Sequence, residues 1–221
     1  MLVSTAAAVA LASLATWIGL HPATVPPAVR LEAVSDPGPA PFSTGVGHDH
    51  DDVVPPANVG GDQRGDTPGL YGQAGDACDP DALVTALQRD GRAAAWARAA
   101  GRSDDDAEAT IKTLTPLVLR TDVLVTEHAW SSDPAASVYR AVLQAGSAVL
   151  VDDRGLPRAR CASGNPLGPP AVALGTDLAG TPWRWFSPSA VTLVTDAEHP
   201  LTKIVALDLD SGTTVDVSTR H

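Results

Sequence analysis

The stretch that decides the fold is AVLVDDRGLPRARC, residues 148–161. Residues 149–151 form a short apolar run, meet the turn-forming residues 153–155 and return toward Cys161, which is the pattern of a β-hairpin. Pro157 cannot donate a ladder hydrogen bond, so we expect the returning strand to lie at a sheet edge or to contain a bulge. The hairpin places one of the two cysteines of the chain at the end of a strand.

The other cysteine, Cys78, lies just before a predicted helix. The pair could form a disulfide or a redox couple, or supply one catalytic thiol. Their long separation argues against a redox C-x-x-C motif, and two cysteines alone are too few for a structural zinc site. We therefore predict a structural disulfide between Cys78 and Cys161. Because disulfides persist mainly outside the cytoplasm, this pair also predicts an oxidising compartment.

Three short helices are predicted on the N-terminal side of the hairpin. The first begins with Asp79 as N-cap and Pro80 at the first helical position, the second ends at Gly101, and the third begins at Ser103. From Pro116 onward the pattern changes to short apolar runs that are typical of strands. These runs cover residues 117–119, 123–125, 138–143, 148–152, 191–194, 203–208 and 213–217. The order predicts an α+β fold, with three short helices followed by a small antiparallel sheet or open barrel and one disulfide.

The N-terminal part of the chain differs in composition. Residues 2–20 are apolar and uncharged and have about the length of a membrane span, so we interpret residues 1–20 as a signal anchor or a signal peptide. Residues 21–30 indicate a linker, and residues 31–200 a single extracytoplasmic domain with a disordered acidic insert near residues 45–67. Residues 201–221 are expected to form C-terminal strands or a tail.

Composition excludes some classes of function. The formal net charge is −11, and no cluster of Lys and Arg interrupts the acidic surface, so we expect no nucleic-acid partner. Aromatic residues make up only 4% of the chain, and Gly and Pro number 19 each, which indicates many turns and gives each tryptophan unusual weight in the core. No P-loop, G-x-S-x-G or H-E-x-x-H motif occurs.

Seven segments together resemble one family. They are GPAPF (residues 38–42), GLYG (69–72), the helix start at Cys78-Asp79, LTPLVLRTD (114–122), VTEH (125–128), AVLQAGSAVLVDDRGLPRARC (141–161) and GNPL (164–167). The family is the uncharacterised domain-of-unknown-function family numbered 6777, from actinobacteria, and the resemblance covers roughly residues 31–195. It implies a secreted or membrane-anchored domain, and it implies no activity, cofactor or catalytic residue.

The aromatic residues suggest one candidate binding patch. Trp183 and Trp185 would point to the same side of an extended T-P-W-R-W-F segment, and with Phe186 and Tyr71 they could contact a sugar or a peptide. The alternative is that these residues belong to the core. Gly residues around Tyr71 are expected to permit positive φ rather than to hold a ligand.

Two further sets of polar residues are candidates for chemistry. His48, His50 and Asp51 could bind a transition metal weakly, although the same acidic tract could simply be solvated, and we predict neither a metal site nor a cofactor. His128 could act as a general base if Asp122, Asp152 or Asp153 oriented it. Asp152 and Asp153 are better explained as turn residues of the hairpin.

Two hypotheses about function follow. The first is a non-enzymatic extracytoplasmic domain, membrane-anchored through residues 2–20 or secreted, that binds a protein or an envelope component such as a glycan. The second is an exported enzyme of unknown reaction that uses His128 and a nearby carboxylate. A polar cleft around His128 would favour the enzyme, whereas an exposed patch near Trp183 and Trp185 would favour the binding domain.

Overall fold

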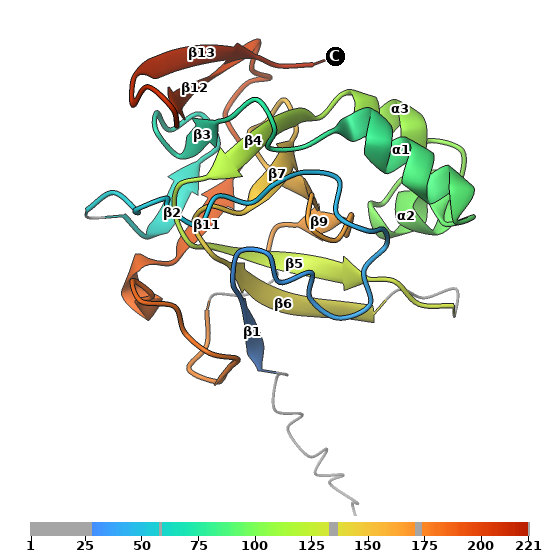
Figure 1. Cartoon of the computed structure of the whole chain (residues 1–221), viewed down its shortest axis with the longest axis horizontal. Coiled ribbons are helices and arrows are strands. Elements are labelled where there is room, and N and C mark those ends of the chain that lie inside the picture. Colours follow the sequence, from blue (N-terminus) through green and yellow to red (C-terminus); the bar gives the residue numbers. More distant parts are fainter. Residues whose placement is uncertain (1–27, 58, 133–136, 171–173, 221) are drawn as a thin grey trace, which may run out of the picture.

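Two mixed β-sheets face each other in the computed structural model, and three helices lie together at one side of them (Figure 1). The structure describes residues 28–57, 59–132, 137–170 and 174–220. Strands make up 31% and helices 14% of the residues that the structure describes. The predicted α+β class with a small antiparallel sheet is therefore wrong, because the protein is mostly β and three strands precede the helices.

The first sheet has the strand order β10-β1-β6-β5-β11-β2, and β9 pairs with β5 off this path. Its strands β1, β6 and β5 form the centre, with β1 parallel to β6 and β5 antiparallel to β6. The bounds are β1 (Val29–Glu32), β2 (Gly61–Arg64), β5 (Val123–Ala129), β6 (Ser137–Leu143), β9 (Leu167–Gly168), β10 (Leu178–Ala179) and β11 (Thr192–Thr195).

The second sheet has the order β13-β12-β3-β4-β7-β8. Its bounds are β3 (Tyr71–Gln73), β4 (Thr115–Leu119), β7 (Ala148–Val151), β8 (Pro157–Arg160), β12 (Lys203–Asp208) and β13 (Thr214–Ser218). Since β12 pairs with β3, the C-terminal strands are part of this sheet rather than a separate tail. The β7–β8 hairpin is confirmed, β8 is an edge strand, and a register shift lies at Leu150/Val151, as Pro157 predicts.

Two turns that precede this hairpin connect the two sheets. Residues 120–122 and 144–147 do not close hairpins, because each connects a strand of one sheet to a strand of the other. The physical reason is that these strands are apolar on both faces. In β7, Val149 and Val151 pack between the sheets, while Ala148 and Leu150 pack toward the helices. A strand buried on both faces needs a layer on each side.

The helices are α1 (Pro80–Arg89), α2 (Ala93–Ala99) and α3 (Ala107–Lys112), and a 3-10 helix covers Pro188–Ala190. Asp79 caps α1 as predicted, since its carboxylate accepts from the backbone N–H of Asp81 and Ala82. The third helix begins at Ala107, four residues after the predicted start. Trp96 of α2 is fully buried against the second sheet, where it anchors the helical layer.

The segment near residues 45–67 does not extend from the body as an acidic insert. The carboxylate of Asp49 accepts from the backbone N–H groups of Ser35 and Ala148, and His50 N–H donates to the carbonyl of Gly146. The segment then continues into β2, which pairs with β11. These hydrogen bonds hold an acidic stretch in place that composition alone suggested would be disordered.

Residues 1–20, the predicted anchor or signal peptide, lie outside the described residues. Across residues 28–57, 59–132, 137–170 and 174–220, no helix combines the length and the apolar character needed to cross a bilayer.

Candidate functional site

A cavity of about 460 Å³ lies beside the edge strand β8. It is formed by α2 and the turn after it, by α3, by the β7–β8 turn and by the end of the chain, which Figure 1 shows approaching α3. The volume falls in the range typical of small-molecule sites. Three guanidinium groups and two carboxylates share this cavity; they belong to Arg102, Arg158, Arg220, Asp152 and Asp153.

Arg158 is held in position by the hairpin turn. Its Nε donates to Oδ2 of Asp152 at 2.6 Å, and the other oxygen of Asp152 accepts from the backbone N–H groups of Arg154 and Leu156, both at 2.9 Å. In the described structure, neither terminal nitrogen of Arg158 has a protein partner. A fixed guanidinium with both terminal nitrogens available can form two parallel hydrogen bonds to a carboxylate or a phosphate.

Arg102 is placed by the end of α2. Gly101 has a φ of +70°, its N–H bonds back to the carbonyl of Arg98, and the N–H of Arg102 bonds back to the carbonyl of Ala97. This is the Schellman arrangement that ends many helices, and it fixes the backbone of Arg102 at the rim of the cavity. Its guanidinium makes no hydrogen bond or ion pair with any described residue.

Arg220 reaches the same cavity from the opposite direction. Its backbone N–H donates to Oγ1 of Thr115, which ties the chain beyond β13 to the start of β4. Within the described ranges its guanidinium has no partner either. Among the described residues, each other Arg or Lys side chain has a hydrogen bond or ion pair, except Arg184, which stacks on Trp185. Arg102 and Arg220 both line this cavity.

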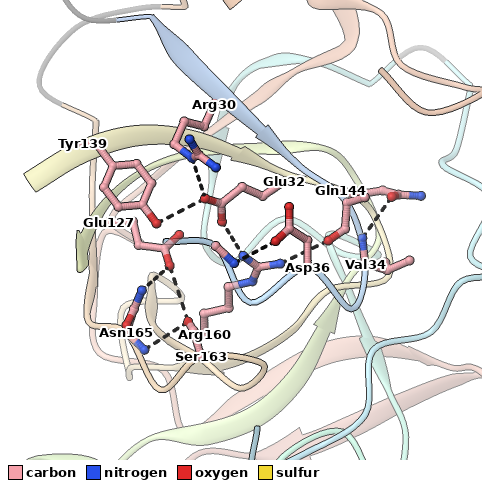
Figure 2. A network of polar contacts seen from close by, with 12 residues as sticks. Arg30, Glu32, Val34, Asp36, Glu127, Tyr139, Gln144, Arg160, Ser163 and Asn165 are labelled. Carbon is pink, nitrogen blue, oxygen red and sulfur yellow. Dashed lines mark hydrogen bonds and ion pairs between the residues drawn. The ribbon is translucent and has the colours of Figure 1, made fainter. Parts of the chain in front are cut away.

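A second cluster of ionisable side chains lies between the two sheets (Figure 2). Glu32 of β1 and Arg160 of β8 form an ion pair in which both side chains are fully buried, and Arg160 also donates to the carbonyl of Ala33 at 3.2 Å. Tyr139 of β6 donates its hydroxyl proton to Glu32 at 3.1 Å, and burial together with the nearby carboxylates raises the pKa of this hydroxyl. The cluster therefore joins the inner faces of the two sheets.

Glu127 of β5 completes this buried cluster. Its Oε1 accepts from Nδ2 of Asn165 at 2.8 Å and from Oγ of Ser163 at 3.4 Å, as Figure 2 shows. Burial, and then the negative charge of Glu32, raise the pKa of Glu127 to about 8, although Arg160 acts in the opposite direction. Glu127 is thus neutral near pH 7, and the single charge of Arg160 is balanced by Glu32.

The loop at residues 35–42 covers this cluster. Gly38 has a φ of +67°, and a Cβ atom there would lie 2.9 Å from Oε1 of Glu32 and 3.0 Å from the hydroxyl of Tyr139. Ser35 and Ala40 also adopt positive φ, at 63° and 46°, which is uncommon for residues other than glycine. The close cover and full burial make the cluster a structural centre rather than an open catalytic site.

Four segments that carry the family resemblance meet at this centre. Residues 38–42 cover it, residues 125–128 contribute Glu127, residues 141–161 contribute Arg160, and residues 164–167 contribute Asn165. The predicted disulfide is confirmed next to it, since Cys161 follows Arg160 and is bonded to Cys78 with a Cα–Cα distance of 5.7 Å. The bond ties the end of β8 to the start of α1.

The predicted aromatic patch is divided in the structure. Trp183 and Phe186 pack edge to face at 5.1 Å against the outer face of the first sheet, and the indole N–H of Trp183 donates to Asp122 at 3.1 Å. Trp185 alone is largely exposed, at 55%, and Arg184 stacks on it. Tyr71 is fully buried between the sheets, where its hydroxyl donates to the carbonyl of Gly155. These four residues therefore form no common surface.

The residues proposed around His128 are not brought together. His128 is half-buried, burial lowers its pKa, and its side chain has no described contact with Asp122, Asp152 or Asp153. Asp122 accepts from the backbone N–H of Ala145, and burial raises its pKa. Asp152 serves the hairpin turn, as the sequence indicates.

The acidic tract places its two histidines near Asp76 rather than around a common centre. His48 Nδ1 lies 3.8 Å and His50 Nε2 lies 3.6 Å from its carboxylate oxygens. In the described part of the chain, no group of three or more His, Cys, Asp or Glu side chains is arranged to hold a metal ion. Asp51 lies in the exposed turn that follows His50.

Sequence reasoning missed the cavity. Successive arginines of the cavity, Arg102, Arg158 and Arg220, are 56 and 62 residues apart in the sequence. Nothing in their local sequence distinguishes them from solvated surface charges. The available signal was the helix stop at Gly101, which fixes the residue after it, and the Asp-x-x-x-x-x-Arg spacing across the hairpin, which places Asp152 beside Arg158.

Comparison with known proteins gives one match. The family model described as Domain of unknown function (DUF6777) matches residues 62–220. No curated protein and no solved structure matches this chain.

Proposed function

We propose that this chain, which belongs to the domain-of-unknown-function family DUF6777, is a non-enzymatic binding domain that recognises an anionic group of a protein or of an envelope component in the cavity beside β8. The observation that carries the proposal is the state of Arg158. Its guanidinium is fixed through Nε by Asp152, its terminal nitrogens have no partner among the described residues, and it lines a cavity together with Arg102 and Arg220.

The charge of the whole chain makes this arrangement specific. The formal net charge is −11, so the surface as a whole repels anions, and a cavity with three guanidinium groups is the exception. Arg158 is already ordered before a ligand arrives, which lowers the entropic cost of binding.

We further propose that the domain acts outside the cytoplasm, tethered or delivered there by residues 2–20. The disulfide between Cys78 and Cys161 supports an oxidising compartment, and the apolar composition of residues 2–20 supports export. Alkylation of free thiols in intact cells, followed by fractionation, tests this part. Recovery of the chain from the cytosol with two free thiols would contradict it.

The binding proposal is tested by titrating the full-length chain with acetate, succinate and inorganic phosphate and measuring heat or thermal shift. Hydrogen bonds to charged groups contribute about 1.5–3 kcal/mol, so Arg158→Gln should weaken binding at least about tenfold. Arg64→Gln is the matched control, because Arg64 is exposed and paired with Asp66 outside the cavity. Equal affinity in the wild type and Arg158→Gln would refute the proposal.

The enzyme hypothesis has weaker support. It needs a carboxylate that orients His128, and the described residues supply none within contact distance. The buried carboxylates of Glu32 and Glu127 are used to neutralise and support Arg160 beneath the loop at residues 35–42. We therefore retain the binding domain as the proposed function.

A further inference from the structure

We infer that the ligand of the cavity is zwitterionic, with a carboxylate that binds the guanidinium groups and an ammonium group that binds Asp153. The inference rests on the proposed function, since it names the ligand class for the same cavity. Amino acids, peptides with free termini and peptide-bearing polymers carry this combination of charges.

The first argument is the placement of opposite charges. Asp153 follows Asp152 in the hairpin turn and lines the cavity together with Arg102 and Arg220. In the part of the chain described here, the carboxylate of Asp153 has no hydrogen bond or ion pair, and no guanidinium of the cavity lies within ion-pair distance of it. Asp153 and the guanidinium groups of Arg102 and Arg220 thus line one cavity without forming an ion pair with each other.

The second argument is that Asp153 is held by its backbone. Its carbonyl accepts from the N–H of Leu201 at 2.7 Å, and the adjacent Asp152 is fixed by two backbone N–H groups. The turn therefore fixes the backbone from which the carboxylate extends, just as it fixes Arg158. A ligand with charges of both signs can form an ion pair with Asp153 and with the guanidinium groups at the same time. A simple anion leaves Asp153 unpaired and is repelled by its carboxylate.

The third argument is that Asp152 is not available for this role. Its two oxygens already accept three hydrogen bonds, from Arg154 N, Leu156 N and Arg158 Nε. Of the two adjacent aspartates, Asp152 orients the guanidinium of Arg158, and Asp153 lines the cavity with a carboxylate that has no partner among the described residues. This division of roles separates a positioning residue from a residue that contacts the ligand.

The experiment is a titration of the full-length chain with ω-amino acids of increasing length, from glycine to 8-aminooctanoate, each compared with the ω-hydroxy acid of the same length. The hydroxy acid keeps the carboxylate and the length and removes only the positive charge. At least one amino acid should bind about fivefold more tightly than its hydroxy counterpart, which is the scale of a partly exposed ion pair. The best length measures the distance between the two charge sites.

Asp153→Asn tests the residue. It should remove the preference for the amino acid and leave the affinity for the hydroxy acid unchanged or slightly improved, because the turn contacts of Asp152 are retained. Arg158→Gln should weaken both ligands. Asp105→Asn, on the exposed surface before α3, is the control and should change neither.

The outcomes separate the two proposals. Binding of the hydroxy acids that depends on Arg158, with no preference for any amino acid, would overturn the zwitterion inference and leave the anion site standing. A preference that survives Asp153→Asn would also overturn it. Failure of every carboxylate and of inorganic phosphate to bind, or binding that ignores Arg158→Gln, would overturn both.

Discussion

Glu127→Gln tests whether a neutral carboxyl lies at the centre of the protein. The wild-type Glu127 is fully buried, accepts hydrogen bonds from Asn165 and Ser163 through Oε1, and has a pKa raised to about 8, against 4.5 for a free glutamate. Glutamine has the shape of the protonated acid. Its carbonyl oxygen can keep both hydrogen bonds, and its amide nitrogen takes the place of Oε2, which has no partner in the described structure.

The sign of the pH dependence follows from the raised pKa. Below pH 4.5 both the folded and the unfolded chain hold the proton on Glu127, and the contribution of this carboxyl to stability is fully present. As the pH rises from 4.5 to about 8, only the unfolded chain releases the proton, so the folded state loses stability relative to it. Each pH unit of this interval corresponds to about 1.4 kcal/mol, which amounts to on the order of 5 kcal/mol in total.

The assay is urea unfolding of the wild type and Glu127→Gln from pH 4.5 to pH 9 with the disulfide intact. The difference in unfolding free energy should shift in favour of the variant by several kcal/mol between pH 4.5 and 8.5, because all other titrating groups are common to both chains. Glu108→Gln is the control, since Lys112 lowers the pKa of Glu108 and the carboxyl is exposed. A difference between Glu127→Gln and wild type that stays constant across this range would refute the reasoning.

Three further predictions concern stability. Cys161→Ser removes the disulfide between residues that are 83 positions apart, and the loop-entropy relation assigns this disulfide about 4.5 kcal/mol of stabilisation. We therefore expect a clear fall in the melting temperature; an unchanged melting temperature would mean that the disulfide does not stabilise the fold. Gly38→Ala should cost more than Gly91→Ala in chemical denaturation, because both glycines have φ near +66° but only the first has neighbours within 4 Å; equal costs would assign the effect to backbone strain alone. Trp96→Ala should lower the free energy of unfolding by about 3–5 kcal/mol and Trp185→Ala by less than about 0.5 kcal/mol, because Trp96 is buried and Trp185 is exposed. A larger loss for Trp185→Ala than for Trp96→Ala would contradict this assignment of burial.

Local backbone chemistry was predictable from the sequence. Asp79 has the side chain of an N-cap, Gly101 ends its helix with positive φ, and Pro157 confines its strand to an edge, and all three are confirmed. Each of these outcomes depends on the geometry of a few neighbouring residues. Such rules hold wherever the surrounding fold does not oppose them.

The pairing of strands was not predictable in the same way. The run at residues 117–119 and the run at residues 123–125 look like the two arms of a hairpin, yet they belong to different sheets. A short apolar run does not reveal whether one or both of its faces are covered, and a layer on both faces separates neighbours in sequence. The prediction of a single small sheet failed for this reason.

The buried charges were equally invisible to sequence reasoning. Glu32, Glu127 and Arg160 come from strands far apart in the chain, and in the sequence each resembles a solvated side chain. Their burial is a property of the two sheets together. The aromatic residues led to the opposite error, since Tyr71 was expected on a surface patch and is fully buried.

Strand β8 connects the structural centre with the proposed binding cavity. Arg160 is buried and paired with Glu32, while Arg158, two residues earlier on the same strand, lines the cavity and is held through Nε by Asp152. Cys161 then ties the end of the strand to α1. An edge strand would ordinarily be the most mobile part of a sheet. Because the ion pair, the disulfide and the turn contacts of Asp152 restrain β8 from both ends, the guanidinium of Arg158 is held where a ligand can use it without first ordering the strand.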